Sequence, residues 1–512
     1  MKKYIYIVGF ALFTFFSQAQ SGYDIKVNFK GSKDTVMYLV KYIWDQKYVA
    51  DTCKKVKNGV AEFKGKKDLD KGVYVLVSQA MTTYFDFLIN ETQKFSISAD
   101  VADFGGTLKF TGNKENELFF NYLKLINTKN QEFAKVSAQT KGMNKADSIK
   151  FMAEKSIAFS KEARQADQDF LTKNKGTFLG DFVNLRIEKE DLNPPKAKNG
   201  RPDSVYQYYY YKNHYFDGID FKDERIIRTP YFETKVKRYF ESVIVQHPDT
   251  MIAELDKLFA RCTEGNLVYN LLLGHFTYKA ETNKNMLFDK DGNSLTYEKV
   301  FVHLADKYIV SGKAKAVYSD ETVKIIKDRT DIIRNLLPGA TVAELYMIDT
   351  IHGKQVMKMG FDTCKSSITL SNLYYKKEAQ LKPLYKTLSS VTAKYTVLVF
   401  WASDCGHCMT DIPKLKENLD KIKGKIDYKV FAVQTKDEYE AWRKFIIDKK
   451  LDFINVFDPM HLNNIKDRFD INSTPVIYIL DKNKKIKAKK ISHEQVVELL
   501  ELFEKMDKEQ NK

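Results

Sequence analysis

The chain has 512 residues, of which 44% are hydrophobic and 29% charged, so we expect several folded domains and no large disordered region. Its net charge is +16, but the lysines are dispersed among acidic residues, which indicates a solvated basic surface and no nucleic-acid partner. Five cysteines are too few for a scaffold held together by disulfides.

The first twenty residues predict a secretory signal peptide. Lys2 and Lys3 form a basic start, residues 4–16 are an apolar run too short to span a bilayer comfortably, and "SQAQ" supplies small residues for cleavage near Ala19. A retained membrane anchor is the alternative. We therefore expect a periplasmic or otherwise exported protein once residues 1–20 have been removed.

Residues 21–112 have the pattern of an all-β domain. Short runs such as "VMYLVKY" and "GVYVLV" are rich in β-branched and aromatic residues and are broken by Gly, Asp and Asn. Asn58 and Gly59 predict a hairpin turn, because both tolerate positive φ. This alternation predicts a β-sandwich.

Residues 113–334 predict a helical domain, because apolar residues repeat at helical spacing from about Asn113 onward. Thr229 and Pro230 predict an N-cap followed by proline at the first helical position. We expect most tyrosines of "YQYYYY" (206–211) to lie in the core or at its rim. "DKDGNS" (289–294) is interpreted as a plain turn, because its glycine is not at the sixth position that a calcium loop requires.

Residues 335–512 alternate strand-like and helical segments, which predicts an α/β sheet domain. An apolar strand leads directly into two cysteines, and two further strand-like runs follow. The lysines of 482–490 are expected to flank a solvated edge strand. Cys53, Cys262 and Cys364 stand alone in the sequence and are expected to be buried among apolar side chains.

The motif "FWASDCGHC" carries the clearest chemistry. Two residues between Cys405 and Cys408 allow both sulfurs to meet in one short loop, as a reversible disulfide requires. Cys405 is expected at a helix N-terminus, where the partial positive charge favours the thiolate. Cys408 lies one turn further and can attack a mixed disulfide on Cys405. Haem attachment needs histidine where Met409 stands, and no second pair of ligands for zinc is evident.

These residues, with Pro413 in the following helix and "STPVIYILD" further on, resemble thioredoxin-like oxidoreductases of the TlpA/ResA-like envelope branch. The resemblance covers about residues 335–512. It implies a cis peptide bond between Thr474 and Pro475, beside the active-site disulfide. It also implies that Asp411, three residues after the second cysteine, manages protons for Cys408. An acid that only suits the helix dipole is the alternative for Asp411.

Two features leave the direction of electron flow open. Val399 stands where cytoplasmic thioredoxins carry a buried aspartate. His407 between the cysteines resembles the CGHC motif of disulfide isomerases and would raise the reduction potential, whereas the envelope branch favours reduction of partner disulfides. Trp401 and Gly406 are expected to support the site by packing and by forming the turn.

Together these features predict a multidomain α+β protein with an N-terminal β-sandwich, a central all-α domain and a C-terminal thioredoxin-like α/β domain. The first two resemble uncharacterised domains that accompany thioredoxin modules in bacterial envelope proteins. We expect an enzyme that exchanges disulfides with envelope proteins, uses no metal or cofactor besides the Cys405–Cys408 disulfide, and could have a membrane-side electron donor or acceptor. The alternative is a ligand- or protein-binding module in which the thioredoxin-like domain is structural.

Overall fold

The computed structural model describes residues 22–510 except 192, 284–286, 290–293 and 316. The expected signal peptide and most of the 289–294 segment therefore lie outside the described residues. No helix of the described part is long and apolar enough to cross a membrane. The chain divides into two compact units, the first made of Met1–Gln246 and Ala253–Leu271 and the second of His247–Ile252 and Leu272–Lys512.

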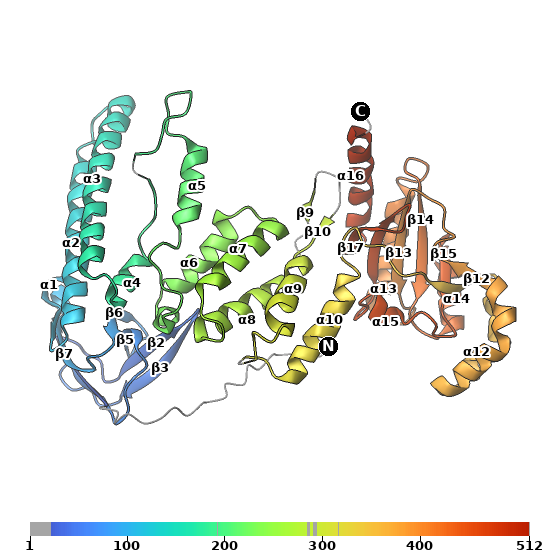
Figure 1. Ribbon diagram of the computed structural model, residues 1–512, viewed down its shortest axis with the longest axis horizontal. Helices are drawn as coiled ribbons and strands as arrows, with labels where there is room; N and C mark the ends of the chain where they lie inside the picture. Colours follow the sequence, from blue (N-terminus) through green and yellow to red (C-terminus); the bar gives the residue numbers. More distant parts are fainter. Residues whose placement is uncertain (1–21, 192, 284–286, 290–293, 316, 511–512) are drawn as a thin grey trace. The chain divides into compact units, whose positions relative to one another are not determined.

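The first unit begins with a β-sandwich, as predicted (Figure 1). Its two described sheets have the orders β4-β1-β7-β8 and β3-β2-β5-β6. Alternate side chains of each strand point inward, so Val27 and Phe29 of one sheet share a buried cluster with Leu39 and Leu76 of the other. The strands are β1 (Tyr23–Lys30), β2 (Met37–Ile43), β3 (Gln46–Cys53), β4 (Val60–Gly65), β5 (Gly72–Ser78), β6 (Thr83–Ile89), β7 (Lys94–Asp100) and β8 (Lys109–Thr111).

The predicted turn at Asn58 and Gly59 is confirmed. Their φ angles are 52° and 77°, and the Val60 N–H donates to the Lys57 carbonyl over 2.9 Å. A Cβ on Gly59 would lie 1.9 Å from the Phe29 carbonyl oxygen, so glycine is required there. The strand after the turn, however, pairs with β1 and not with β3.

Helices follow the sandwich, and the change to helical spacing at Asn113 is confirmed because Asn113 caps α2. Phe119 and Tyr122 of α2 pack with Val75 on the outer face of the second sheet. A short ladder of β9 (Leu287–Phe288) and β10 (Ser294–Leu295) interrupts the helical region. The helices are α1 (Phe104–Thr107), α2 (Lys114–Ala138), α3 (Lys145–Lys173), α4 (Phe178–Asn184), α5 (Ser204–His214), α6 (Phe232–Arg238), α7 (Pro248–Arg261), α8 (Leu267–Thr282), α9 (Glu298–Leu304) and α10 (Asp320–Arg334).

One prediction for the helical region holds in part and one needs correction. Of the tyrosines of 206–211, Tyr208, Tyr210 and Tyr211 are half-buried, as expected of residues at the rim of a core, but none is fully buried, and Tyr209 is 55% exposed. Consecutive residues point around the whole circumference of a helix, so α5 cannot turn them all toward one core. The Thr229 hydroxyl does accept the Phe232 N–H at 3.4 Å, but α6 begins only at Phe232, so Pro230 precedes the helix and does not open it.

A seven-stranded sheet forms the centre of the second unit, in the order β12-β11-β15-β14-β13-β16-β17 within its described residues. β13, β14 and β15 are parallel neighbours, so their carboxyl ends share one edge. Val399 and Trp401 of β13 face one core and Phe400 faces the other. The elements are β11 (Tyr346–Asp349), α11 (Gly353–Met357), α12 (Ser367–Leu381), β12 (Tyr385–Thr387), β13 (Tyr395–Trp401), α13 (Gly406–Asp420), β14 (Tyr428–Gln434), α14 (Tyr439–Asp448), β15 (Ile454–Phe457), α15 (Ile465–Arg468), β16 (Val476–Asp481), β17 (Ile486–Ile491) and α16 (Gln495–Gln510).

β17 is an edge strand, as predicted, but its lysines are not all solvated. Lys489 is 5% exposed and forms an ion pair with Glu298 of α9. Lys484, just before the strand, donates to the Val391 carbonyl over 2.8 Å and is also buried. Helix α9 and the segment before β13 cover these ammonium groups, which the strand pattern alone did not indicate.

Candidate active site

The redox motif joins the centre of the sheet to a helix. β13 is buried at every position and ends at Trp401. Four residues later Cys405 is the N-cap of α13, which begins at Gly406. The Cys405 sulfur accepts the backbone N–H of Cys408 at 3.5 Å. The sequence therefore located the first cysteine correctly at a helix N-terminus.

The environment of Cys405 favours its thiolate. Partial burial raises the pKa of this thiol, but hydrogen bonding with Thr474 and with the backbone N–H groups of His407 and Cys408 outweighs burial and lowers the pKa below its ordinary value. Cys405 remains partly exposed at the protein surface. An accessible thiol with a lowered pKa is the nucleophile that disulfide exchange requires.

Cys408 has the opposite environment. It is fully buried, in a cluster with Trp401 and Ile412. Burial raises the pKa of its thiol to about 12, so near neutral pH it remains protonated. The two sulfurs of one helical turn thus differ strongly in acidity, and only the first is poised to react with a partner.

The segment around Pro475 lies against the motif. The Thr474–Pro475 peptide bond is cis, as the resemblance implies, and the Cys405 thiol donates to the Thr474 carbonyl oxygen over 3.3 Å. Residues 69 positions apart in the chain are therefore in direct contact. β16, which follows Pro475, pairs antiparallel with β13 and holds this loop beside the helix N-terminus.

Asp411 has a partner that the sequence did not indicate. Its carboxylate lies 3.8 Å from Nε2 of His493, a histidine that is 8% exposed. The same nitrogen lies 2.9 Å from Glu494. His493 follows β17, 82 residues after Asp411, and a lone histidine among lysines gives no sequence signal for such a contact. Asp411 itself is on the first turns of α13, one turn beyond Cys408.

The other expected site residues lie around the turn. Trp401 is fully buried, with its ring 5.3 Å from that of Phe445, so it packs beneath the site. His407 is exposed and contributes its backbone N–H to the environment of Cys405. A Cβ on Gly406 would meet no atom within 4 Å, so sterics do not require glycine there.

The three single cysteines were expected to be buried, and this is wrong. Cys53, Cys262 and Cys364 are each partly exposed. Burial nevertheless raises the pKa of the Cys262 thiol to about 12. Each of these cysteines is half-buried. Apolar neighbours in the sequence do not show whether a cysteine is fully buried or only half-buried.

Comparison with known protein families supports the domain order. Residues 379–489 match the AhpC/TSA family. Residues 23–119 match a domain of unknown function, DUF4369, and residues 200–335 match another, DUF5106. No curated protein matches the chain significantly.

Several solved structures are similar to parts of the chain. A domain of a possible thiol-disulfide isomerase from Cytophaga hutchinsonii is 35% identical, with 34% of this chain and 96% of that chain covered and a TM-score of 0.26. A thioredoxin-like protein from Bacteroides caccae is 17% identical, over 60% of this chain and 98% of that chain, with a TM-score of 0.40. The thioredoxin domain of a thiol-disulfide oxidoreductase from Bacteroides vulgatus is 20% identical. The match covers 32% of this chain and 96% of that chain, with a TM-score of 0.25. The chain therefore belongs to the thioredoxin-like thiol-disulfide oxidoreductase family, with its thioredoxin-like domain at the C-terminus and DUF4369 and DUF5106 domains before it.

Proposed function

We propose that this protein is an exported enzyme that exchanges disulfides with proteins of the bacterial envelope. The observation that carries the proposal is the contrast between the two thiols of one turn. The pKa of the accessible Cys405 is lowered, whereas burial raises the pKa of Cys408 to about 12. An attacking thiolate beside a protected second thiol is the arrangement needed for a two-step exchange.

In the first step the Cys405 thiolate attacks one sulfur of a substrate disulfide. A mixed disulfide forms, and the other substrate sulfur leaves as a thiolate and takes up a proton. In the second step Cys408 loses its proton and attacks the Cys405 sulfur. The Cys405–Cys408 bond forms and the second substrate sulfur is released as a thiol. The substrate gains two electrons and two protons. The enzyme supplies both electrons and the Cys408 proton, and the other proton comes from water, which received it when Cys405 ionised.

The proposed proton acceptor for Cys408 is Asp411, one turn further along α13. The buried imidazole of His493 lies 3.8 Å from the Asp411 carboxylate. Pro475 and the Thr474 carbonyl would form the platform on which the substrate chain lies, because this carbonyl contacts the attacking sulfur and Pro475 directly follows it.

Export is proposed from the basic start, apolar run and small residues at the N-terminus. Outside the cytoplasm, an enzyme that reduces substrates ends in the oxidised form and would need a membrane-side electron donor. An enzyme that oxidises substrates ends in the reduced form and would need a membrane-side electron acceptor. His407 favours a reduction potential that is closer to the potential of disulfide isomerases than to that of thioredoxin. No nucleic-acid partner is proposed.

Trapping tests this function. With the reduced full-length Cys408→Ser variant, we expect Cys405 to accumulate mixed disulfides with protein substrates, because the second step is blocked. The Cys405→Ser/Cys408→Ser variant controls for capture through Cys53, Cys262 or Cys364. Equal capture by both variants, or no exchange by the wild type with any protein disulfide, would refute the proposal.

A further inference from the structure

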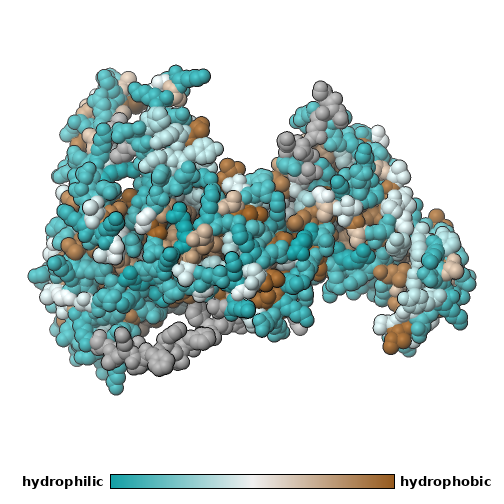
Figure 2. Space-filling view, in the orientation of Figure 1, coloured by the Kyte–Doolittle hydropathy of each residue, from teal (hydrophilic) through white to brown (hydrophobic). Residues whose placement is uncertain are grey.

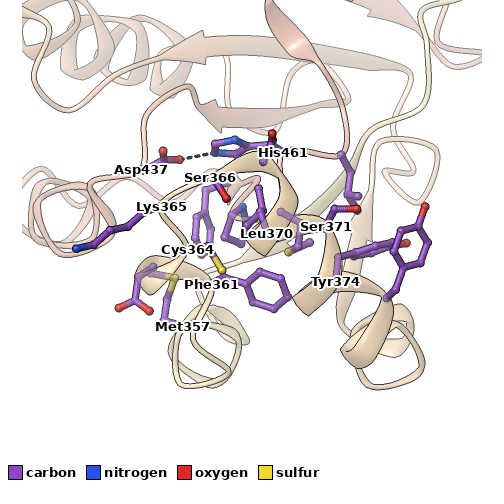
Figure 3. A pocket seen from close by; sticks show the side chains of 17 residues that line it. Met357, Phe361, Cys364, Lys365, Ser366, Leu370, Ser371, Tyr374, Asp437 and His461 are labelled. Carbon is purple, nitrogen blue, oxygen red and sulfur yellow. Dashed lines mark hydrogen bonds and ion pairs between the residues drawn. The ribbon is translucent and has the colours of Figure 1, made fainter.

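A cavity of about 530 Å³ opens beside the sheet of the second unit (Figure 3). One wall comes from the segment between β11 and β12, which contains α11, a 3-10 helix over Phe361–Thr363 and α12. The opposite wall comes from the loops that follow β14 and β15, represented by Asp437 and His461. None of these residues belongs to the redox motif.

The cavity lies at the same edge of the sheet as Cys405. β13, β14 and β15 are parallel neighbours, and Cys405, Asp437 and His461 each follow the carboxyl end of one of them. Neighbouring strands are about 4.8 Å apart, so the cavity wall after β15 begins about 10 Å from the line of β13. Ligands of parallel sheets bind at this edge.

Polar contacts connect the turn between β13 and α13, which carries Cys405, to the cavity wall. Asp404, directly before Cys405, lies 3.7 Å from Lys436. The next residue, Asp437, lies 3.0 Å from the His461 ring, and both of these line the cavity. A series of polar contacts therefore runs along this edge from the residue before Cys405 to the cavity wall.

The lining is apolar at its base and polar at its rim. Met357, Phe361 and Met460 contribute apolar surface, and Figure 3 shows Phe361 and Leu370 beside one another at the cavity. Its volume lies in the range of ligand pockets, about 300–1,000 Å³. Methionine side chains adapt to differently shaped apolar groups, a property of surfaces that accept varied polypeptides.

Helix α12 extends this apolar surface outward. Ile368 and Tyr375 of α12 are 71% and 70% exposed, and Figure 2 shows hydrophobic residues at the surface of the segment that carries α12. The charged side chains at the rim are of both signs, with Lys365 and Asp362 beside the Asp437–His461 pair. This balance gives no preference for an anionic or cationic ligand and favours a neutral apolar group.

We propose that the cavity binds an apolar side chain of an extended polypeptide substrate while a cysteine of the same segment reacts at Cys405. The inference rests on the proposed function, which requires a polypeptide at this edge of the sheet. An extended chain advances about 3.4 Å per residue, so the apolar residue would stand about three positions from the reacting cysteine. In this arrangement Cys405 carries out the disulfide exchange. The cavity makes the enzyme favour substrates that have an apolar residue near the reacting cysteine.

Blocking the cavity tests the inference. Ser371 is an exposed residue of α12 that lines the cavity, whereas the adjacent Asn372 is exposed and does not. Ser371→Trp is therefore the test variant and Asn372→Trp its matched control; Ser367→Trp, also at the cavity and exposed, is a second test variant. The substrates are a disulfide-bonded peptide with leucine three residues from its cysteine, the same peptide with aspartate there, and glutathione disulfide.

For the wild type we expect the leucine peptide to react about tenfold faster, in kcat/KM, than the aspartate peptide, as burial of one apolar side chain predicts. Ser371→Trp and Ser367→Trp should abolish this preference and leave the rate with glutathione disulfide unchanged. Asn372→Trp should retain the preference. No preference in the wild type, or equal loss in Asn372→Trp, would overturn the inference.

A binding measurement separates this inference from the proposed function. A fluorescent leucine peptide with serine in place of cysteine should bind the wild type and Asn372→Trp more tightly than Ser371→Trp. If this difference is seen but no disulfide reacts, the proposed function fails and the cavity still binds polypeptide. If disulfides react but this binding difference is absent, the function stands and the cavity has no part in it.

Discussion

The chemical difference between Cys405 and Cys408 arises from their places at one helix, the N-cap and a position three residues later. The N-cap residue stands at the N-terminal end of the helix, where free backbone N–H groups and a hydrogen bond with the Thr474 side chain stabilise a thiolate. The residue one turn later points into the core with Trp401 and is shielded from water. The same two-residue spacing therefore gives one accessible acidic thiol and one protected weakly acidic thiol.

Asp411→Asn should slow the second step of exchange and not the first. The amide cannot accept the Cys408 proton, and positioned general bases contribute about 10²-fold or more to such steps. Rapid acid quenching of a single turnover should then show the mixed disulfide accumulating as it decays about 10²-fold more slowly. Glu417→Gln, an exposed acid of the same helix, should behave like the wild type. An unchanged decay in Asp411→Asn would leave Asp411 as an acid that only suits the helix dipole.

The sequence identified the residues of this site that belong to local motifs. Cys405 and Cys408 follow from their spacing and from the apolar strand before them, and Thr474 follows from the family resemblance. His493 could not be predicted, because its contact with Asp411 depends on how the end of β17 returns to α13. The cavity was missed for the same reason, since its walls come from three separate loops.

Among the secondary-structure elements, β17 and α9 form an unusual contact. Lys489 points from the edge strand into a covered position, where burial lowers the pKa of its ammonium group and Glu298 is its ion-pair partner. The side chain of Glu298 is itself mostly buried. A buried charge of this kind depends on its partner, because its hydration has been lost.

Glu298→Ala should destabilise the protein by about 3–5 kcal/mol, because it leaves the buried Lys489 ammonium unpaired. Urea unfolding at neutral pH measures the change. Asp331→Ala, which removes the exposed partner of Lys327, should have little effect. Glu298→Ala/Lys489→Met should recover much of the loss, and failure to do so would show that packing of the Glu298 side chain, and not its charge, is what matters.

Periodicity predicted the alternation of strands and helices around β13 well, because each face of the sheet is covered and the strands are apolar throughout. It failed where tertiary contacts override local pattern. Lysines in an edge strand normally indicate that the strand is exposed to solvent, but α9 covers Lys489. Tyrosines normally indicate buried positions, but α5 carries too many of them in succession for all to lie on one buried face.

Across the chain, the helices that follow residue 272 pack as part of the same compact unit as the thioredoxin-like sheet. Arg329 of α10 lies 3.2 Å from Asp470, which also accepts a hydrogen bond from Asn472 over 2.7 Å. Asn472 stands two residues before Thr474, so α10 contacts the loop that reaches the active site. The second unit thus combines part of the DUF5106 region with the redox domain.

A fragment of residues 267–512 should therefore be more stable than one of residues 335–512. The shorter fragment lacks Glu298 and Arg329, which leaves Lys489 and Asp470 without these partners. We expect a lower melting temperature for the shorter fragment by thermal unfolding. Equal melting temperatures would show that the sheet domain does not depend on the helices before it.

The most direct test is the pH dependence of alkylation of Cys405 in the reduced full-length protein, followed by mass spectrometry of the modified peptide. Only the thiolate reacts, so the rate rises as pH passes the pKa, and a lowered pKa moves the midpoint below the ordinary value of about 8.5. Cys262, with its pKa raised to about 12 by burial, is the unreactive internal control. We predict a Cys405 midpoint below that of an ordinary exposed thiol. A midpoint at or above that of an ordinary thiol would contradict the account of Cys405 as an activated nucleophile.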